Sequence, residues 1–271
     1  MSTHCTRDEM MLICAAREIQ DRDKVIAGQG LPMVAAVLAK HFHAPHCTLI
    51  TEAGMVDFAP FASLLHVADP TAIKGYAYCC DMIDIFTTIA NRGFVDVCFL
   101  GVAQVDRFGN INTTVVGDYK RPKLRLMGSG GAPEFLACSN RTVLTMRGGR
   151  FVQKLDYLTS PGFLTGGNAR EEMGMPAGSG PTALITTQGV FRFTQDTKEL
   201  MLAEVFPGSQ VEDIKKEVPW DLKISSDLRE SEPPSPEHVE FMRRFEPGVP
   251  IGKRLTMEFY AKAMMQFLQK S

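Results

Sequence analysis

The sequence has no excess of charge of either sign. Its 29 lysines and arginines are balanced by 31 aspartates and glutamates, which gives a formal net charge of −2 over 271 residues. A chain that binds nucleic acid usually carries a strong basic excess, because it has to neutralise phosphates. We therefore expect no nucleic-acid partner.

Long hydrophobic runs are also missing. No stretch approaches the roughly 18 consecutive apolar residues that a membrane-spanning helix needs. Residues 1–9 do not show the basic segment followed by an apolar segment that is typical of a secretory signal. These absences predict a cytoplasmic chain without membrane contact.

The seven cysteines are an odd number, and none stands in a Cys-x-x-Cys pair. In a cytosolic chain this indicates reduced thiols and not a disulfide framework. His41, His43 and His46 lie close to Cys47, so their spacing alone leaves a zinc site open. We favour a solvated helix end, because Pro45 keeps one regular element from presenting all three rings. We expect no bound metal and no tightly bound cofactor.

Motifs for nucleotide phosphates are incomplete or absent. Gly28-Gln29-Gly30 follows a predicted strand and precedes a predicted helix, but Met33 occupies the place of the third glycine of a dinucleotide-binding fingerprint. No Gly-x-x-x-x-Gly-Lys-Ser/Thr sequence is present. We therefore interpret residues 28–30 as a turn.

Hydrophobic residues make up 45% of the chain, enough for a sizeable core. In the first half, apolar runs typical of strands alternate with helical patterns. The predicted strands are 24–27, 47–51 and 95–102. The predicted helices are 10–19, opened by a capping box at Thr6 and Glu9, then 31–41 and 81–92. This alternation predicts an α/β fold with an open, mostly parallel sheet flanked by helices.

The second half contains more strand signals, which predict an additional β-rich region. The predicted strands are 142–146, 155–159, 182–187, 190–193 and 201–205. Ser209 and Glu212 suggest a second capping box before a short helix. We expect a single domain over residues 1–271, in which residues 229–271 form an appended surface linker (229–236) and a helix (256–269).

Glu52 is the candidate for chemistry that the residues themselves suggest. It ends an apolar strand and is followed by the small residues Ala53 and Gly54. A carboxylate in that position would be partly desolvated and more reactive as a nucleophile or base. The alternative is a glutamate that simply emerges into solvent. In open α/β sheets, however, active sites form at the carboxyl ends of strands.

A glycine-rich loop is the second candidate. Gly128-Ser129-Gly130-Gly131 lies between two strand-like regions. Glycines allow several main-chain N–H groups to converge on an anion, such as a phosphate or the oxyanion of a tetrahedral intermediate. A plain connecting loop would have the same sequence, so this alternative stays open.

Several stretches together resemble one known family. They are residues 28–32 (GQGLP), 51–57 (TEAGMVD), 103–112 (AQVDRFGNIN), 117–119 with 128–132 (GDY and GSGGA), and 156–162 (DYLTSPG). The chain resembles the B (β) subunit of class I CoA-transferases, in particular the glutaconate CoA-transferase type. The resemblance implies a CoA-transferase/NagB-like fold.

The resemblance also implies a site and a reaction. Glu52 falls on the family's catalytic glutamate, which carries CoA as a covalent glutamyl thioester, so CoA is a substrate and not a resident cofactor. The residues implied for oxyanion and substrate binding are Ala53, Gly54, Gln104, Gly130 and Gly131. The implied acyl partner is a small carboxylic or dicarboxylic acid.

A further implication is an A (α) subunit that completes the pocket in a hetero-oligomer, with exposed apolar surface at the seam between subunits. Two alternatives stay open. The same fold also serves CoA-thioester decarboxylases and hydrolases, and the chain could act as a scaffold without its own chemistry. Retention of Glu52 favours transfer.

Overall fold

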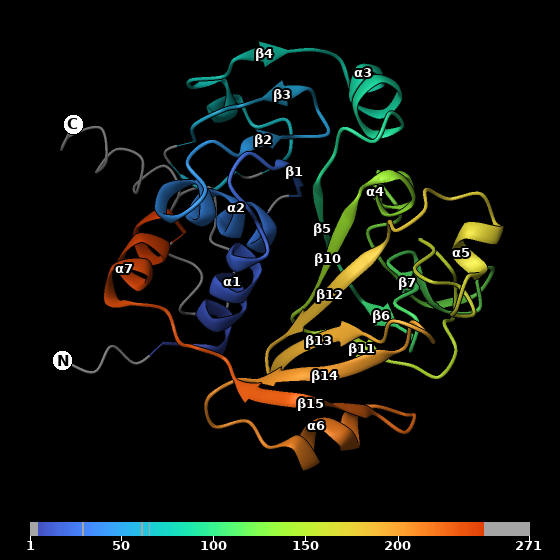
Figure 1. The fold of residues 1–271 in the computed structure, drawn as a ribbon. Helices are drawn as coiled ribbons and strands as arrows, with labels where there is room; N and C mark the ends of the chain where they lie inside the picture. Colours follow the sequence, from blue (N-terminus) through green and yellow to red (C-terminus); the bar gives the residue numbers. More distant parts are fainter. Residues whose placement is uncertain (1–4, 29, 61, 65, 247–271) are drawn as a thin grey trace.

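The computed structural model describes residues 5–246 except 29, 61 and 65; the helix expected at 256–269 lies outside these residues. Ten strands form the main sheet (Figure 1). They are β1 (Lys24–Ala27), β2 (Thr48–Ile50), β3 (Met55–Val56), β4 (Tyr78–Cys79), β5 (Val97–Gly101), β10 (Arg141–Met146), β12 (Pro181–Thr186), β13 (Gly189–Phe193), β14 (Leu200–Val205) and β15 (Lys223–Glu230).

The strand order is β15-β14-β13-β12-β10-β5-β1-β2-β3-β4. The central strands from β12 to β2 are all parallel. Antiparallel pairs flank this centre, with β13 and β14 on one side and β3 and β4 on the other. The predicted α/β fold with an open, mostly parallel sheet is confirmed. Its parallel register brings the carboxyl ends of β1, β2, β5 and β10 to one edge.

Helices cover both faces of the sheet. One face carries α1 (Arg7–Arg17), α2 (Leu31–Phe42) and α7 (Pro236–Phe245). The other face carries α4 (Ala132–Cys138), α6 (Val211–Glu217) and a helical segment made of α3 (Met82–Asp84) and a π-helical turn η2 (Ile85–Ala90). The 3₁₀ turn η1 (Pro70–Ile73) and the short helix α5 (Ala169–Glu172) lie in connections. In the part of the chain that the structure describes, no helix has the length and apolarity needed to cross a membrane.

The two faces follow from the alternation of side chains along each strand. Val25 and Leu49 point into the core under α1 and α2, whereas Ile26, Ile50 and Cys98 point into the core under α4 and η2. Both cores are apolar, as expected for strands buried on both sides. The same alternation sets the face of the sheet to which a residue just past the carboxyl end of a strand is directed.

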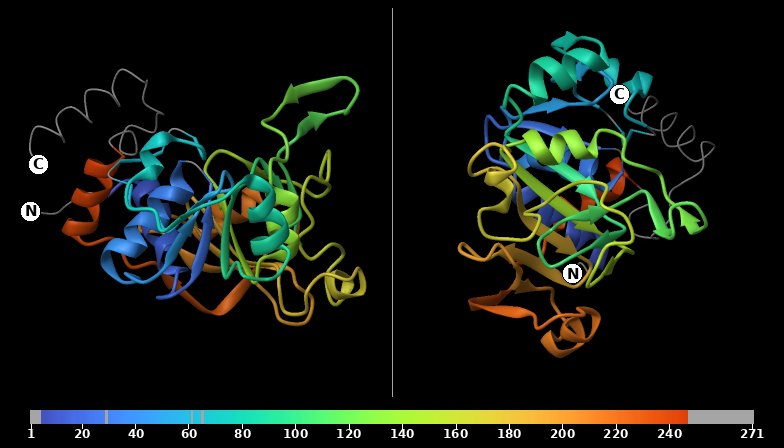
Figure 2. Two further views of the ribbon diagram at one scale, coloured as in Figure 1. Left: turned by 90° about the horizontal axis from the view of Figure 1, so that it is seen from above. Right: turned by 90° about the vertical axis from the view of Figure 1, so that its right-hand side faces the viewer.

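The predicted β-rich region of the second half does not form a separate layer, because its strands β10, β12, β13 and β14 belong to the main sheet. Two smaller sheets that the sequence pattern did not predict lie outside the main sheet. The first has three strands, β6 (Gln104–Val105), β7 (Ile111–Asn112) and β11 (Arg150–Phe151). The second is a hairpin of β8 (Val115–Gly117) and β9 (Pro122–Arg125), which projects away from the body (Figure 2). Near the other end of the main sheet, the sole tryptophan, Trp220, is buried against Phe151.

Several local predictions are wrong. Residues 155–159 form no strand, because Asp156 and Thr159 turn their side chains to the hairpin region and only one isolated bridge, at Ser160, pairs with Ile111. Residues 229 and 230 belong to β15, and α7 begins at Pro236, which shortens the predicted linker to 231–235.

Two helix beginnings also differ from prediction. The capping box at Ser209 does not form, because Gln210 is the N-cap of α6 and no side chain caps it. The glycine loop at 128–131 is followed by α4 and not by a strand. In contrast, the capping box at Thr6 and Glu9 is confirmed.

Candidate active site

Glu52 lies in a tight turn at the carboxyl edge of the sheet. The turn spans residues 51–54 between β2 and β3, and the N–H of Gly54 donates to the carbonyl of Thr51 over 3.1 Å. The buried Thr51 hydroxyl accepts from the N–H of Met55 at 3.2 Å. Since β1 and β5 end at the same edge as β2, the turn presents Glu52 where the strands of the parallel centre terminate.

Gly54 fixes the shape of this turn. Its φ is +107°, and a Cβ at this position would lie 1.8 Å from the carbonyl oxygen of Cys80. The approach is close because β3 and β4 pair here, with the N–H of Cys80 donating to the carbonyl of Gly54 over 3.0 Å. A side chain at residue 54 would force the two strands apart, so the turn that carries Glu52 depends on this glycine.

The Glu52 side chain is half-buried, and so is its neighbour Ala53. Among the described residues, no hydrogen bond or ion pair engages the Glu52 carboxylate. Its charge does act on Cys98 in β5: burial raises the pKa of the Cys98 thiol, and the nearby Glu52 carboxylate raises it further. Cys98 and Ile50, the last residue of β2, both face the core under α4.

The glycine loop, residues 128–131, leads directly into α4. Thr113 anchors its start, since the N–H of Gly128 donates to the Thr113 carbonyl over 3.0 Å and the Thr113 hydroxyl donates back to the Gly128 carbonyl over 2.8 Å. Within the described part of the chain, the N–H groups of Gly130 and Gly131 have no hydrogen-bond acceptor. Gly130 is exposed, whereas Gly131 is buried against Phe86 and Phe135, and the contact of either N–H with an oxyanion stays a prediction.

The turn at Glu52 and the glycine loop pack against the same segment, residues 80–90. Cys80 pairs with Gly54, as described above. Six residues further on, Phe86 stacks on Phe135 of α4 with ring centroids 4.9 Å apart. A Cβ on Gly131 would lie 2.7 Å from the Phe86 ring, so loop and ring are in close contact. The structure therefore brings the two candidate site elements to one neighbourhood.

Gln104 is placed differently from the other predicted site residues. It is buried in β6, where its amide nitrogen donates to Asp156 over 2.8 Å and its amide oxygen accepts from Asn112 over 2.7 Å. Asn112 in turn donates to the carbonyl of Val115 and accepts from the N–H of Thr114. With both ends of its amide engaged, Gln104 holds Asn112 and Asp156, which in turn bind the backbone of β8 at Val115 and Gly117. The substrate contact of Gln104 stays a prediction.

The rest of the 103–112 motif forms a second buried polar cluster. Asp106 accepts from the N–H groups of Phe108 and Asn110 at 2.9 and 3.1 Å, and the Asn110 amide donates to the Asp106 carboxylate at 2.8 Å. Burial raises the pKa of the Asp106 carboxyl despite these donors. The Asn110 oxygen also accepts from the N–H groups of Gly162 and Leu164, which ties in the 156–162 stretch.

Sequence reasoning missed Arg170, a buried arginine that supports α4. Its guanidinium donates to the carbonyls of Leu136 and Ala137 at 2.6 and 2.9 Å, near the end of α4. It also donates to the carbonyls of Pro161 and Gly162. Desolvation lowers its pKa to about 10. No sequence signal identifies this residue, because its main-chain acceptors come together only in the folded chain.

The histidines near Cys47 have separate partners. The His43 ring lies 3.1 Å from the Ala16 carbonyl, His46 pairs with Asp21 at 2.9 Å, and His41 stacks on Phe241. The described residues contain no group of three side chains that could hold a metal ion. The zinc-site alternative therefore has no support in the geometry.

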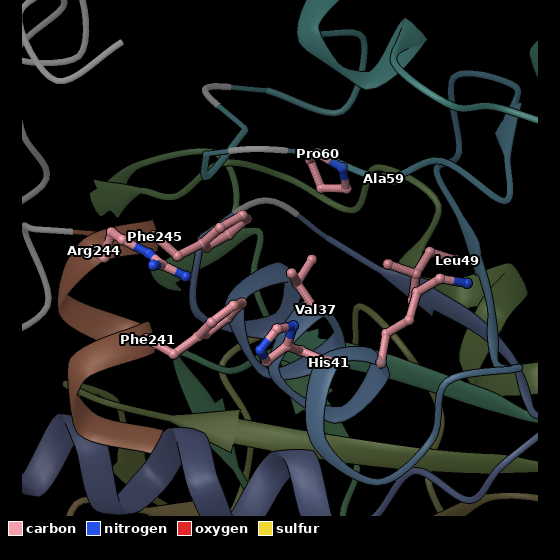
Figure 3. Close-up of a pocket in the computed structure, with 9 residues that line it drawn as sticks. Val37, His41, Leu49, Ala59, Pro60, Phe241, Arg244 and Phe245 are labelled. Carbon is pink, nitrogen blue, oxygen red and sulfur yellow. The ribbon is translucent and has the colours of Figure 1, made fainter. Parts of the chain in front are cut away.

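Three cavities of the described residues are lined by none of the predicted site residues, and one of them, of about 420 Å³, lies between α1 and β13–β15 around Arg192 and Glu204. The other two lie nearer the carboxyl edge of the sheet or α7. One, of about 340 Å³, is lined by the residues drawn in Figure 3 from α2, β2, the 59–60 connection and α7, and includes none of the predicted site residues. The other, of about 390 Å³, lies where β5 and β10 end and α2 begins, between residues 101–103 and residues 147–149. This second cavity opens at the same sheet edge as the turn of Glu52.

Most of the exposed large apolar side chains of the described residues fall into two groups, and Phe94 and Met173 belong to neither. One group lies on the segment beside the Glu52 turn and the other around the β8–β9 hairpin. The first group is Ile73, Tyr76, Tyr78, Met82 and Ile83; the second is Tyr119, Leu124, Met127, Tyr157 and Leu158. Such surface is typical of a subunit interface.

Glu52 at the carboxyl edge of the sheet and the glycine loop both border residues 80–90 on this α/β fold. The family model described as Coenzyme A transferase matches residues 9–217, and the chain belongs to this family. It is 34% identical over 258 residues to the B subunit of glutaconate CoA-transferase from Acidaminococcus fermentans, covering 91% of this chain and 94% of that protein. It is 35% identical over 248 residues to the B subunit of 3-oxoadipate CoA-transferase from Pseudomonas knackmussii, covering 91% and 95%.

Solved structures agree with these relatives. The crystal structure of glutaconate coenzyme A-transferase from Acidaminococcus fermentans superposes with a TM-score of 0.83 at 33% identity, covering 91% of this chain and 96% of that one. The decarboxylase AibA/AibB shares the fold, with a TM-score of 0.76 at 24% identity over 90% of this chain and 96% of its own. The predicted family and fold are confirmed.

Proposed function

We propose that this chain is the B-type component of a hetero-oligomeric acyl-CoA:carboxylate CoA-transferase of the glutaconate type, in which Glu52 carries CoA as a covalent thioester. The observation that carries the proposal is the Glu52 carboxylate itself. It is half-buried at the sheet edge and free of protein partners in the described part of the chain, and its turn packs against the same segment, residues 80–90, as the glycine loop that carries the unpaired N–H groups of Gly130 and Gly131.

The proposed reaction proceeds in balanced steps. A Glu52 oxygen attacks the thioester carbonyl of the acyl-CoA, and the CoA thiolate leaves as a mixed anhydride forms. The thiolate then attacks the Glu52 carbonyl, which frees the first carboxylic acid and leaves the glutamyl-CoA thioester. The acceptor carboxylate reverses both steps, giving ping-pong kinetics.

The glycine loop would stabilise the tetrahedral intermediates. Each of these steps places negative charge on a carbonyl oxygen, and a single well-aimed N–H donor contributes about 3 kcal/mol to its stabilisation. Gly130 and Gly131 are the proposed donors, whereas Ala53 and Gly54 shape the turn next to the nucleophile. A desolvated carboxylate is a stronger nucleophile than a solvated one, which suits the half-buried position of Glu52.

The B-type relatives support an A-type partner that completes the pocket. The names of these relatives favour a small dicarboxylic acid or its CoA thioester as substrate. CoA enters and leaves in each cycle, so it is a substrate of the proposed reaction and not a resident cofactor.

Reductive trapping tests the proposal. The complex with its A-type subunit is incubated with acyl-CoA and then with borohydride, which reduces a glutamyl thioester to a stable alcohol. Peptide mass mapping is expected to find this alcohol at Glu52 alone. Glu52→Gln is expected to abolish both the mark and acyl exchange, whereas the exposed glutamate variant Glu172→Gln keeps both.

The result that would overturn the proposal is acyl exchange without any mark at Glu52, or full exchange by Glu52→Gln. Release of carbon dioxide from the acyl-CoA without exchange would instead favour the decarboxylase alternative on the same fold.

A further inference from the structure

The β8–β9 hairpin, residues 115–125, is here called the arm. It forms a two-stranded sheet of its own, paired with no other strand, and projects from the body (Figure 2). An isolated hairpin of this size is at best marginally stable in water. Its two outer edges carry unpaired backbone groups that are ready for another chain. A contact with another chain would stabilise such an extension.

The arm is strongly basic although the chain as a whole is slightly acidic. It carries four cationic side chains, Lys120, Arg121, Lys123 and Arg125, against one carboxylate, Asp118. None of the four forms an ion pair within the described part of the chain. The positive charge of the arm is therefore available to an acidic surface on a partner.

Exposed apolar groups accompany this charge. Tyr119 is 51% exposed, Leu124 55% and Met127, just beyond β9, 87%. Aromatic residues, methionine and arginine are the types enriched in protein interfaces and in their energetic centres. A nucleic acid would use the charge but leave the leucine and methionine without apolar partners, so a protein surface fits the arm better.

The tip of the arm is already structured. The Asp118 carboxylate accepts from the N–H groups of Lys120 and Arg121, both at 2.9 Å. The Arg125 guanidinium donates to the Tyr119 carbonyl over 2.7 Å and lies 4.6 Å from the centre of its ring. Tyr119 also stacks on Tyr157 of the body at 5.3 Å. A preformed tip loses little conformational entropy on docking.

The arm continues directly into the glycine loop. Leu126 donates its N–H to the Thr114 carbonyl over 3.0 Å, and Gly128 is bonded to Thr113 in both directions, so the base of the arm is also the start of the loop. In β8, the other strand of the arm, the Gly117 N–H donates to the Asp156 carboxylate over 3.0 Å. The same carboxylate accepts a hydrogen bond from the Gln104 amide nitrogen. A contact that immobilises the arm would therefore also immobilise the glycine loop.

We infer that the arm docks into an acidic groove of the A-type subunit and that this docking fixes the glycine loop for catalysis. The inference rests on the proposed function for the identity of the partner. The A-type subunit is the occupant that the arm's connection to the site favours, because the pocket at the glycine loop is the one that this subunit completes. The alternative partner is a second copy of this chain. Its own arm carries the same positive charge, which disfavours contact between the two arms.

The test measures binding and exchange separately. The chain is titrated against the A-type transferase subunit of the same organism, and affinity is measured by calorimetry at two salt concentrations. The arm variants are Lys120→Glu with Arg121→Glu, and separately Leu124→Ser. The matched control is Lys215→Glu with Lys216→Glu in α6, which makes the same change of charge at exposed positions far along the chain.

We expect each arm variant to weaken association at least about 30-fold, the effect of losing an interface hot spot, while the control binds like the wild type. The charge variant should also lose most of the salt dependence of binding. Unchanged melting temperatures of the isolated variants establish that the body is intact, since all three substituted positions are exposed. At saturating A-type subunit, acyl exchange should still be slower in the arm variants, because the loop is less firmly held.

Wild-type affinity in both arm variants would overturn the inference. Self-association of the isolated chain that the arm substitutions abolish, with normal binding of the A-type subunit, would overturn it in favour of a second copy. Failure of the proposed function gives a different result: no exchange and no mark at Glu52 in the wild-type complex, while the arm substitutions still weaken association.

Discussion

Two short motifs at the same end of the molecule use their polar side chains in opposite ways. In residues 51–54, the Glu52 carboxylate makes no hydrogen bond to the described residues. In residues 103–112, Gln104, Asp106, Asn110 and Asn112 satisfy one another and nearby main-chain groups. Buried polar groups that are fully paired build structure, and an unpaired one at a sheet edge is available for chemistry. The comparison separates the proposed nucleophile, Glu52, from polar side chains that stabilise the fold around it.

The largest effect on stability is expected from Gly54→Ala. The new methyl group would meet the Cys80 carbonyl at 1.8 Å and the residue would be held at a φ of +107°, so the β3–β4 pairing has to move. We expect a loss of about 4 kcal/mol in the free energy of unfolding and of at least about 100-fold in exchange rate. Urea unfolding and steady-state exchange measure both.

Gly208→Ala is the matched control for this change. Gly208 also has a positive φ, +79°, but open space where a Cβ would stand. It should cost only about 1 kcal/mol. Equal costs at both positions would show that close packing at Gly54 does not hold the turn.

Arg170→Met tests the support of α4. Four main-chain carbonyls would lose their donor inside the protein, which is expected to lower the free energy of unfolding by about 3 kcal/mol. Since α4 follows the glycine loop, kcat should fall more than KM for acyl-CoA rises. Arg229→Met, which removes an arginine side chain that is itself 73% exposed, should cost less than Arg170→Met. A pure rise in KM would contradict the positioning role.

Asn112→Ala and Glu52→Ala test the contrast between the paired polar side chains of residues 103–112 and the unpaired Glu52 carboxylate. Removing the fully buried Asn112 amide breaks bonds to Gln104 and to the 114–115 backbone, and should lower the free energy of unfolding by about 2 kcal/mol. Glu52→Ala should change it by less than about 0.5 kcal/mol yet reduce exchange at least about 10³-fold. If Glu52→Ala were the more destabilising of the two, the division of roles would be wrong.

The smallest effect concerns pH. Hydrogen bonds from the Gly117 N–H and then from Gln104 lower the pKa of the Asp156 carboxyl. A lowered pKa in the folded state adds stability that is present above the ordinary value of about 3.9 and is lost as pH falls through the folded value. The difference in unfolding free energy between wild type and Asp156→Asn should therefore shrink below about pH 4. A difference that grows on acidification would contradict it.

Much of the fold could be predicted because local pattern and tertiary role agree. The strand at 24–27, the helix that begins at Leu31 and the capping box at Thr6 all carry their own signals, and the structure confirms them. The position of Glu52 at a strand end was equally predictable. Its part in catalysis stays a prediction.

The errors occur where distant contacts override local pattern. Residues 155–159 look like a strand, but Asp156 is held by Gln104 and Gly117 and not by a neighbouring strand. The helix α7 was missed because its charged, proline-rich beginning resembles a linker, although Ser235 before Pro236 is a valid helix cap. Arg170 has no local signal at all, since every partner reaches it through the fold.

The single indole of the chain has a practical consequence. Trp220 packs against Phe151 and under Arg107, whereas the fully buried Cys98 thiol lies in β5 at the centre of the main sheet. Because the chain has six other cysteines, labelling during denaturation has to be resolved by peptide mass mapping to follow Cys98 alone. Tryptophan fluorescence and Cys98 labelling that change together would establish that these two parts of the core open as one cooperative unit, and a lag between them would reveal which part opens first.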